Sequence, residues 1–380
     1  MLRSLWECER PPVDTEVLLI LNSSKTDSEA IRQANRQTYH QAVEWIEAHQ
    51  DTSLQYHLLN FPDLPPKHAG VGLARKIGMD EAAARFHHCD RLDQGVIICF
   101  DADCRCAPNF LVAYARHFAK NPEIAGCSTY FEHPLEGPEQ PALYEAAAAY
   151  ELHLRYHIEA LRYIKFPFAH HTVGSSMAVR ALTYLRLGGM NRRKAGEDFY
   201  FFQKLMMNAP ISELTTTTVY PSVRPSHRVP FGTGKAINQI LSGEPQTTYP
   251  FLAYLDLQML VTAVQTLTEV PVAGDASFLA PLPSPLAQFL QANDYEEALG
   301  EIAENVGDIV QFNKRFWHWF NGFRCMKFLN WVVTSHYRRV PVIKGAAEPC
   351  LLERIGNHNQ HEHSVPELLR LYRKKQTMRQ

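Results

Sequence analysis

The chain of 380 residues has no apolar run long enough to cross a bilayer, and its N-terminus has no apolar core of a signal peptide. It also has no excess of charge, because 38 lysines and arginines face 40 aspartates and glutamates, for a formal net charge of -2. This balance argues against nucleic acid as a partner. We therefore expect a protein without a transmembrane segment, located in the cytoplasm, with peripheral attachment at the inner membrane face left open.

The eight cysteines show neither a disulfide framework nor the spacing of a common structural zinc site. They are scattered through apolar and mixed surroundings, which predicts free thiols in a reducing compartment. Cys104 and Cys106, with 87–89 (HHC) upstream, are a weaker alternative as a zinc site.

Strand and helix patterns alternate over the first hundred residues. Apolar runs rich in β-formers at 15–22 and 54–59 predict buried strands, and the helical patterns at 27–49 and 73–88 follow them. A third apolar run ends at Asp101. Such alternation predicts an α/β fold with a mostly parallel sheet flanked by helices, in which ligands bind at the carboxyl ends of the strands. Asn22 and Asp101 both follow strand ends, so we expect them at the same rim of the sheet.

The second half of the chain changes character near residue 235. Before it, we expect strands at 126–131 and 172–179 and helices at 141–163 and 181–187. After it, long helical patterns dominate, and an aromatic stripe around Trp317 and Phe320 is typical of helix packing. We therefore expect an α/β domain over 1–235 and a mainly helical C-terminal region over 236–380. The expected C-terminal helices cover 249–267, 286–303 and 306–336.

The segment 95–111 combines an apolar run with two aspartates, Asp101 and Asp103, at its end. Two carboxylates in a turn after a buried strand suit a divalent metal, because Mg²⁺ and Mn²⁺ take oxygen ligands. An ordinary solvated turn explains the same pair when nothing else supports a site. The other motifs of the chain must decide between these interpretations.

Further motifs surround this pair in a fixed order. Downstream lie 174–180 (GSSMAVR), 187–190 (LGGM) and 196–201 (GEDFYF), and upstream lie 22–27 (NSSKTD) and 73–78 (LARKIG). In this order the motifs resemble the GT-A nucleotide-sugar glycosyltransferases, most closely those of the family 2 type. The similarity spans roughly residues 1–235.

The resemblance implies a metal-dependent, inverting glycosyltransferase that moves a sugar from a nucleotide-diphosphate donor to a hydroxyl acceptor. Asp101 and Asp103 would hold Mg²⁺ or Mn²⁺ on the donor diphosphate, with Asp103 the more direct ligand and Asp101 also a candidate ribose contact. His227 would be the third metal ligand. Asp198 would be the catalytic base, and Glu197 would orient the acceptor or tune its neighbour. A helix that begins at Phe199 explains both acidic residues equally well.

The same resemblance implies a donor-binding set. Asn22 and Ser23 replace the aspartates that commonly contact the donor base, and an asparagine still donates and accepts hydrogen bonds. Arg75 and Arg228 are further donor contacts, the latter to the diphosphate. Gly189 would let the backbone approach the sugar, although a helix C-cap explains this glycine locally.

The chain departs from the family pattern at its start, because the family's first strand would precede residues 2–8. Either the gene start is assigned too late, or the chain is shortened, or the sheet is completed differently. A missing central strand would expose a sheet edge and remove part of the nucleotide pocket. The Gln-x-x-Arg-Trp signature of processive synthases is absent, which favours a single-addition transferase whose acceptor, a glycan, lipid or small molecule, is left open. One alternative is a nucleotidyltransferase, whose Gly-rich, Arg-containing loop is not visible. Another is a catalytically degenerate GT-A domain that binds a nucleotide sugar or a partner protein.

Overall fold

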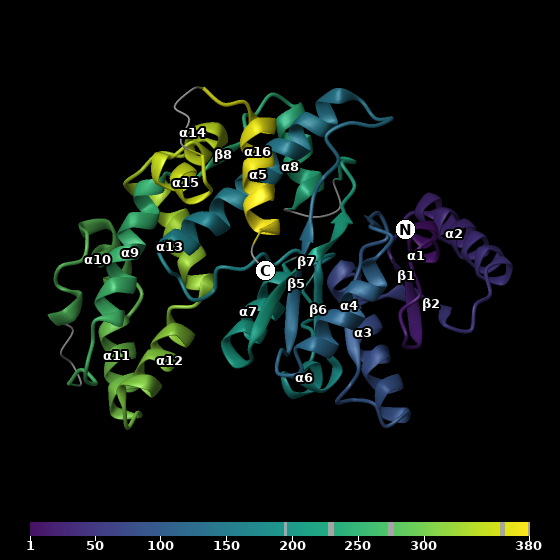
Figure 1. Ribbon diagram of the computed structural model, residues 1–380, viewed down its shortest axis with the longest axis horizontal. Helices are drawn as coiled ribbons and strands as arrows, with labels where there is room; N and C mark the ends of the chain where they lie inside the picture. The colour runs from purple at the N-terminus through teal and green to yellow at the C-terminus, as the bar shows by residue number, and fades with distance from the viewer. Residues whose placement is uncertain (194–195, 227–231, 273–276, 358–361, 379–380) are drawn as a thin grey trace. The chain divides into compact units, whose positions relative to one another are not determined.

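The computed structural model describes residues 1–193, 196–226, 232–272, 277–357 and 362–378 (Figure 1). The fold is a mixed α/β fold, as the sequence predicts. The chain forms two compact units, of which the first contains Met1–Pro138 and Thr172–Asn238 and the second contains Glu139–His171 and Gln239–Met378. The expected active-site residues that the structure describes all belong to the first unit.

The first unit begins with a βαβ element. Strand β1 (Thr15–Ser24) pairs in parallel with β2 (Leu54–Leu64), and helix α2 (Glu29–Ala48) connects them. Ser28 caps α2 by accepting a hydrogen bond from the Ile31 amide at 3.4 Å. The short helix α1 (Leu2–Trp6) packs its Trp6 ring at 6.2 Å from Trp45 of α2, between ring centroids.

A separate five-stranded sheet forms the centre of the first unit, in the order β3-β6-β5-β7-β4. Only β5 and β7 are parallel in it, and the other three pairings are antiparallel. Its strands, in chain order, are β3 (Val96–Cys99), β4 (Arg105–Cys106), β5 (Gly126–Phe131), β6 (Met177–Arg180) and β7 (Ile211–Tyr220).

The expectation of a mostly parallel sheet is therefore wrong for the described strands. Alternation of strands and helices predicts their order along the chain, but it does not fix the direction in which each strand enters the sheet. Between β5 and β6 the chain passes through residues 139–171 of the second unit, and it returns at the end of the sheet where β5 leaves. The returning strand β6 therefore runs antiparallel to both of its neighbours.

Helix α3 (Val71–His88) packs against both sheets. A Cβ atom at Gly78 would lie 3.2 Å from Ile20 of β1, and the Met79 sulfur lies 3.6 Å from the Cys99 thiol of β3. Met79 and Cys99 belong to a buried core with residues of β6 and of helices α6 (Ala181–Arg186) and α7 (Glu197–Asn208). Consequently α3, β3 and α7 share one packed interior, which fixes their relative positions.

Strands β1 and β3 each have an edge without a strand partner among the residues that the structure describes. The apolar residues Val17 to Leu21 of β1 are only half-buried, although a continuous apolar run is typical of a strand that is covered on all sides.

The second unit is mainly helical. Helix α5 (Pro141–Tyr163) belongs to it, together with helices from the last third of the chain. The expected segments 286–303 and 306–336 each break into two helices, and the aromatic stripe packs inward, with Phe316 and Phe320 fully buried. The main C-terminal helices are α9 (Phe251–Gln265), α10 (Ser284–Gln291), α11 (Tyr295–Glu304), α12 (Ile309–Trp319), α13 (Gly322–Ser335) and α16 (Val365–Thr377).

A buried ionic cluster joins α5 to α16 within the second unit. The Glu151 carboxylate is completely buried and accepts hydrogen bonds from Arg155 at 2.7 Å and from Arg373 at 2.8 Å. The Arg155 side chain also donates to Gln376 of α16. Buried charges persist only when they are paired and hydrogen-bonded, so this cluster specifies how the two helices dock.

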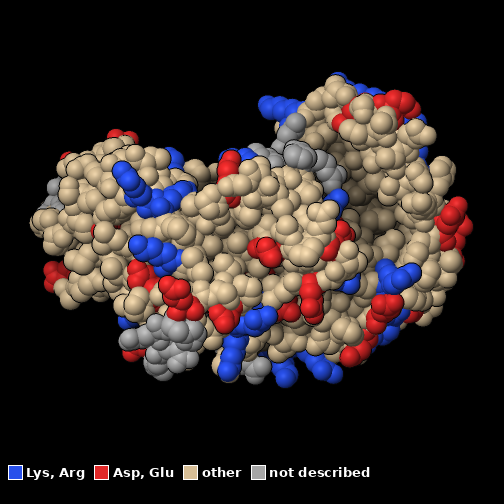
Figure 2. Space-filling view, turned by 90° about the horizontal axis from the view of Figure 1, so that it is seen from above, with Lys and Arg blue, Asp and Glu red and all other residues tan. Residues whose placement is uncertain are grey.

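In Figure 2 basic and acidic side chains are interspersed over the face shown, and the coloured residues form no continuous basic area there. All eight cysteines are free thiols. None of the helices within the described ranges is long and apolar enough to cross a membrane.

Candidate active site

Asp101 and Asp103 lie in a turn between the two outermost strands of the five-stranded sheet. The turn is closed by a hydrogen bond from the Cys104 amide to the Asp101 carbonyl at 3.0 Å. Because β3 and β4 form opposite edges of the sheet, the segment between them must cross the end where β3, β5 and β7 finish. The two carboxylates are 39% and 37% exposed, so they are open to a ligand.

Arg75 of α3 connects this turn to the acidic pair of α7. Its guanidinium donates to Asp101 Oδ1 at 2.7 Å and also to the Glu197 carboxylate. The arginine side chain is 8% exposed and that of Glu197 is 3% exposed. A Cβ atom at Gly174 would lie 2.7 Å from this guanidinium, so a glycine there leaves the space that Arg75 occupies. Residues from three separate motifs therefore meet at one arginine.

Glu197 and Asp198 form the first turn of α7. Gly196 precedes them with φ of 72°, a left-handed conformation that favours glycine and turns the chain into the helix. The Asp198 Oδ1 atom accepts a hydrogen bond from the Phe199 amide at 2.8 Å, and the side chain is half-buried. Helix α7 therefore begins at Glu197, two residues before the expected start at Phe199. It holds Glu197 against Arg75 and leaves Asp198 without an ion pair among the described residues.

Burial and like charge set the protonation of these groups. Burial raises the pKa of Asp198, and the charge of Arg75 offsets this only in part. Burial likewise raises the pKa of Glu197 despite its contact with Arg75. For Arg75, burial lowers the pKa, but the surrounding carboxylates, Asp101 foremost, raise it by more. Arg75 therefore stays charged, and Asp198 has a pKa closer to neutrality than an ordinary aspartate.

Arg224 pairs with the other aspartate of the turn. Its Nε and Nη2 atoms donate to Asp103 Oδ2 at 2.9 and 2.7 Å. The antiparallel pairing of β4 with β7 brings the two together, because residues that precede β4 lie beside residues that follow β7. No sequence signal indicated this contact, since β4 is only two residues long.

The charges of this group suit a divalent cation. Four carboxylates, Asp101, Asp103, Glu197 and Asp198, face two guanidiniums, those of Arg75 and Arg224. No cluster of three His, Cys, Asp or Glu ligands occurs within the described ranges. Mg²⁺ is nevertheless often held by one or two carboxylates and takes its other ligands from substrate phosphates. Asp101 and Asp103 fit such a partial site. His227 and Arg228 lie outside the described residues.

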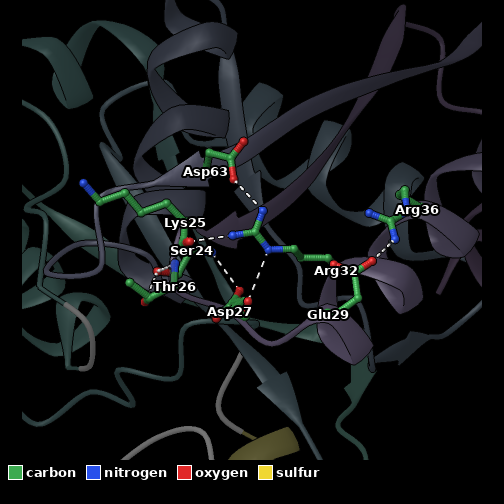
Figure 3. A network of polar contacts seen from close by, with 8 residues as sticks. All are labelled: Ser24, Lys25, Thr26, Asp27, Glu29, Arg32, Arg36 and Asp63. Atoms are coloured by element: carbon green, nitrogen blue, oxygen red, sulfur yellow. Dashed lines mark hydrogen bonds and ion pairs between the residues drawn. The ribbon is translucent and has the colours of Figure 1, made fainter.

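Asn22 and Ser23 lie at the end of β1, which does not pair with β3. Within the described part of the chain, neither side chain forms a hydrogen bond or ion pair with the carboxylates above, so the structure does not join the two groups. The following turn is held by its own contacts, shown in Figure 3. Asp27 accepts from the Ser24 amide at 2.7 Å, and Arg32 of α2 donates to the carbonyls of Lys25 and Asp27. Asn22 and Ser23 are half-buried, and their donor contacts stay a prediction.

Gly189 lies in a turn with φ of 73°, a conformation that favours glycine. The turn is anchored by Tyr184, whose hydroxyl accepts from the Met190 amide at 3.1 Å and donates to Asp80. This agrees with the local explanation as a turn after α6, and the donor contact of Gly189 stays a prediction.

Comparison with known proteins gives no family assignment: no protein-family model matches the chain, and no curated protein does either. The site must therefore be judged on its geometry and on the sequence motifs.

At Gly72, helix α3 closely approaches the backbone at Arg193 and the side chain of Glu197. A Cβ atom at this buried position would lie 1.9 Å from the Arg193 carbonyl oxygen and 3.1 Å from Glu197 Cγ. Gly72→Ala is therefore expected to displace the backbone before α7 and to lower the free energy of unfolding by about 1–3 kcal/mol. Urea denaturation followed by circular dichroism measures this.

Gly300→Ala is the matched control, because its Cβ atom in α11 would meet nothing within 4 Å. This control is expected to stabilise the protein by about 0.5–1 kcal/mol. Equal effects of the two substitutions would contradict the close approach at Gly72.

Proposed function

We propose that the chain is a metal-dependent, inverting glycosyltransferase with a GT-A type first unit, which moves a sugar from a nucleotide-diphosphate donor to a hydroxyl acceptor. The observation that carries the proposal is the contact of one buried arginine, Arg75, with both Asp101 and Glu197. These residues come from three motifs that the resemblance to glycosyltransferases selects. Their contact is what a shared active site requires, and it supports the proposal.

The residues have distinct roles in the proposed reaction. Asp198 takes the proton from the acceptor hydroxyl while the acceptor oxygen bonds to the anomeric carbon of the donor. The bond from that carbon to the diphosphate oxygen breaks, and its electron pair leaves with the nucleoside diphosphate. The anomeric configuration inverts because attack and departure occur on opposite faces.

The remaining charged groups support this displacement. Asp101 and Asp103 would hold Mg²⁺ or Mn²⁺, which neutralises the charge that develops on the leaving diphosphate. Arg75 fixes Asp101 relative to Glu197 and thereby holds the proposed metal ligand near the first turn of α7, which carries Asp198. The acceptor hydroxyl must reach Asp198. The pKa of Asp198 is raised, mainly by burial, and is therefore closer to neutral pH, where the pKa of an effective general base lies.

Calorimetric titration with UDP-, GDP-, TDP- and CMP-sugars, with and without Mn²⁺, tests the proposal. One nucleotide-sugar class is expected to bind, with an affinity at least about tenfold higher when Mn²⁺ is present. Asp103→Asn should remove the metal dependence. Asp93→Asn is the matched control, since Asp93 is exposed and precedes β3 at the opposite end of that strand. Failure of every donor to show metal-dependent binding would contradict the proposed function.

A domain that binds a nucleotide sugar without turnover is the second candidate. The ion pairs of Asp101 and Asp103 with arginines favour it, since each occupies a carboxylate oxygen that a metal would use. Donor binding that does not depend on Mn²⁺, without release of the nucleoside diphosphate in the presence of acceptor mixtures or water, would support this candidate over the transferase.

A further inference from the structure

The two aspartates of the turn are paired with arginines that are held in different ways. Arg75 is 8% exposed and is fixed by two carboxylates and by the backbone at Gly174. Arg224 is 53% exposed, and Asp103 is its one side-chain partner within the described ranges. An exposed arginine with a single partner changes rotamer at little cost, whereas Arg75 cannot move without leaving Glu197 unpaired.

The contact of Arg224 covers one oxygen atom of Asp103. Both Nε and Nη2 donate to Oδ2, so the guanidinium lies against that oxygen edge-on. The other oxygen, Oδ1, lies 3.9 Å from the Cys104 thiol, which is a weak donor. A divalent cation that took Oδ2 would lie next to a positive guanidinium. A cation on Oδ1 would also lie beside this guanidinium, so Arg224 weakens the attraction of Asp103 for a cation on either oxygen.

Arg224 follows closely on the strand that pairs with β4, so its backbone lies near the acidic turn. Arg105 pairs with Tyr220 across β4 and β7, and Arg224 follows four residues later. The Arg224 backbone is additionally held by a hydrogen bond from its amide to the Ser222 hydroxyl at 3.2 Å. When its side chain leaves Asp103, the guanidinium therefore remains beside the turn, within reach of an anion bound there.

We propose that Arg224 is a mobile counter-ion that occupies Asp103, gives this carboxylate up to a divalent cation, and then contacts the diphosphate bound to that cation. The inference rests on the proposed function and adds a residue that no motif of the sequence selects. It predicts that Arg224 weakens the binding of the metal alone and strengthens the binding of the metal with a diphosphate. An ion pair with a purely structural role would not change these two affinities in opposite directions.

The test measures Mn²⁺ binding to the full chain by the loss of the electron paramagnetic resonance signal of free Mn²⁺. Arg224→Gln is expected to tighten the binding of Mn²⁺ alone by about three- to tenfold, because a competing cation is removed. Titration calorimetry measures the binding of the preformed Mn²⁺–pyrophosphate complex, and the same substitution is expected to weaken this binding by about five- to tenfold. Arg224→Lys should change both affinities less than Arg224→Gln does. Lysine keeps the positive charge but loses the contact through two nitrogen atoms.

Arg105→Gln is the matched control. It removes the same charge two residues after Asp103, and the exposed Arg105 forms no ion pair with Asp103 in the described structure. A change of less than about twofold is expected for it. Equal shifts in the two variants, or unchanged Mn²⁺ affinity in Arg224→Gln, would overturn the role of Arg224. Wild-type protein that binds no Mn²⁺, with or without pyrophosphate, would instead overturn the proposed metal site itself.

Discussion

Asp198→Asn is expected to lower the rate of sugar transfer by about 10²–10⁴-fold, the contribution typical of a general base. The affinity for the donor should change by less than about twofold, because the amide has the shape of the carboxylate and still accepts from the Phe199 amide. Single-turnover transfer and calorimetric donor binding measure the two quantities. If the chain is the proposed transferase, these results identify Asp198, and not the neighbouring Glu197, as the base.

The pH dependence of transfer gives a second measurement of the same base. Asp198 must be deprotonated to accept a proton, and burial raises its pKa, partly offset by Arg75. The acid limb of kcat/KM should therefore lie at higher pH than the ordinary range of an aspartate. Transfer should fall as the pH drops through this raised pKa, and the residual rate of Asp198→Asn should lack that limb.

Two results would contradict the assignment. Retained turnover in Asp198→Asn would show that another group takes the proton. Loss of donor binding in the same variant would show that Asp198 supports the fold of the site instead. Asp93→Asn, which removes an exposed aspartate from the other end of β3, controls for a general effect of charge.

The sequence predicts the local elements of this site well, because each depends on a local pattern. The apolar run of β3, the helical pattern of α3 and the acidic start of α7 are all found within two residues of their expected bounds. Glycine at 196 and the following acidic pair are a recognisable helix start. Such signals come from residues that are close neighbours along the chain.

The contacts between these elements could not be predicted in the same way. Arg75 and Glu197 are 122 positions apart, and their pairing depends on how α3 packs against β3 and α7. The contact of Asp103 with Arg224 depends on a two-residue strand, which leaves no periodic pattern in the sequence. The direction of β6 depends on the path of the chain through the second unit. Tertiary packing decided all three features.

Glu151→Ala is expected to lower the free energy of unfolding by about 3–5 kcal/mol, because it leaves two arginines buried without their shared carboxylate. Arg155 is 2% exposed and Arg373 is 12% exposed, so solvent cannot replace the lost partner. Glu151→Gln keeps the shape and one acceptor but loses the charge, and a smaller loss is expected. Urea denaturation gives the size of the effect.

Hydrogen exchange shows which helices lose stability in Glu151→Ala. Peptides from α5 and α16 should lose protection in Glu151→Ala, because this carboxylate joins the two helices, whereas peptides from β5 and β7 of the first unit should keep theirs. Glu145→Ala is the matched control, since Glu145 is an exposed residue of the same helix and its removal should change stability by less than about 0.5 kcal/mol. A loss for Glu151→Ala no larger than that of the control would mean that Arg155 and Arg373 find other acceptors, and that the cluster does not determine how α16 docks on α5.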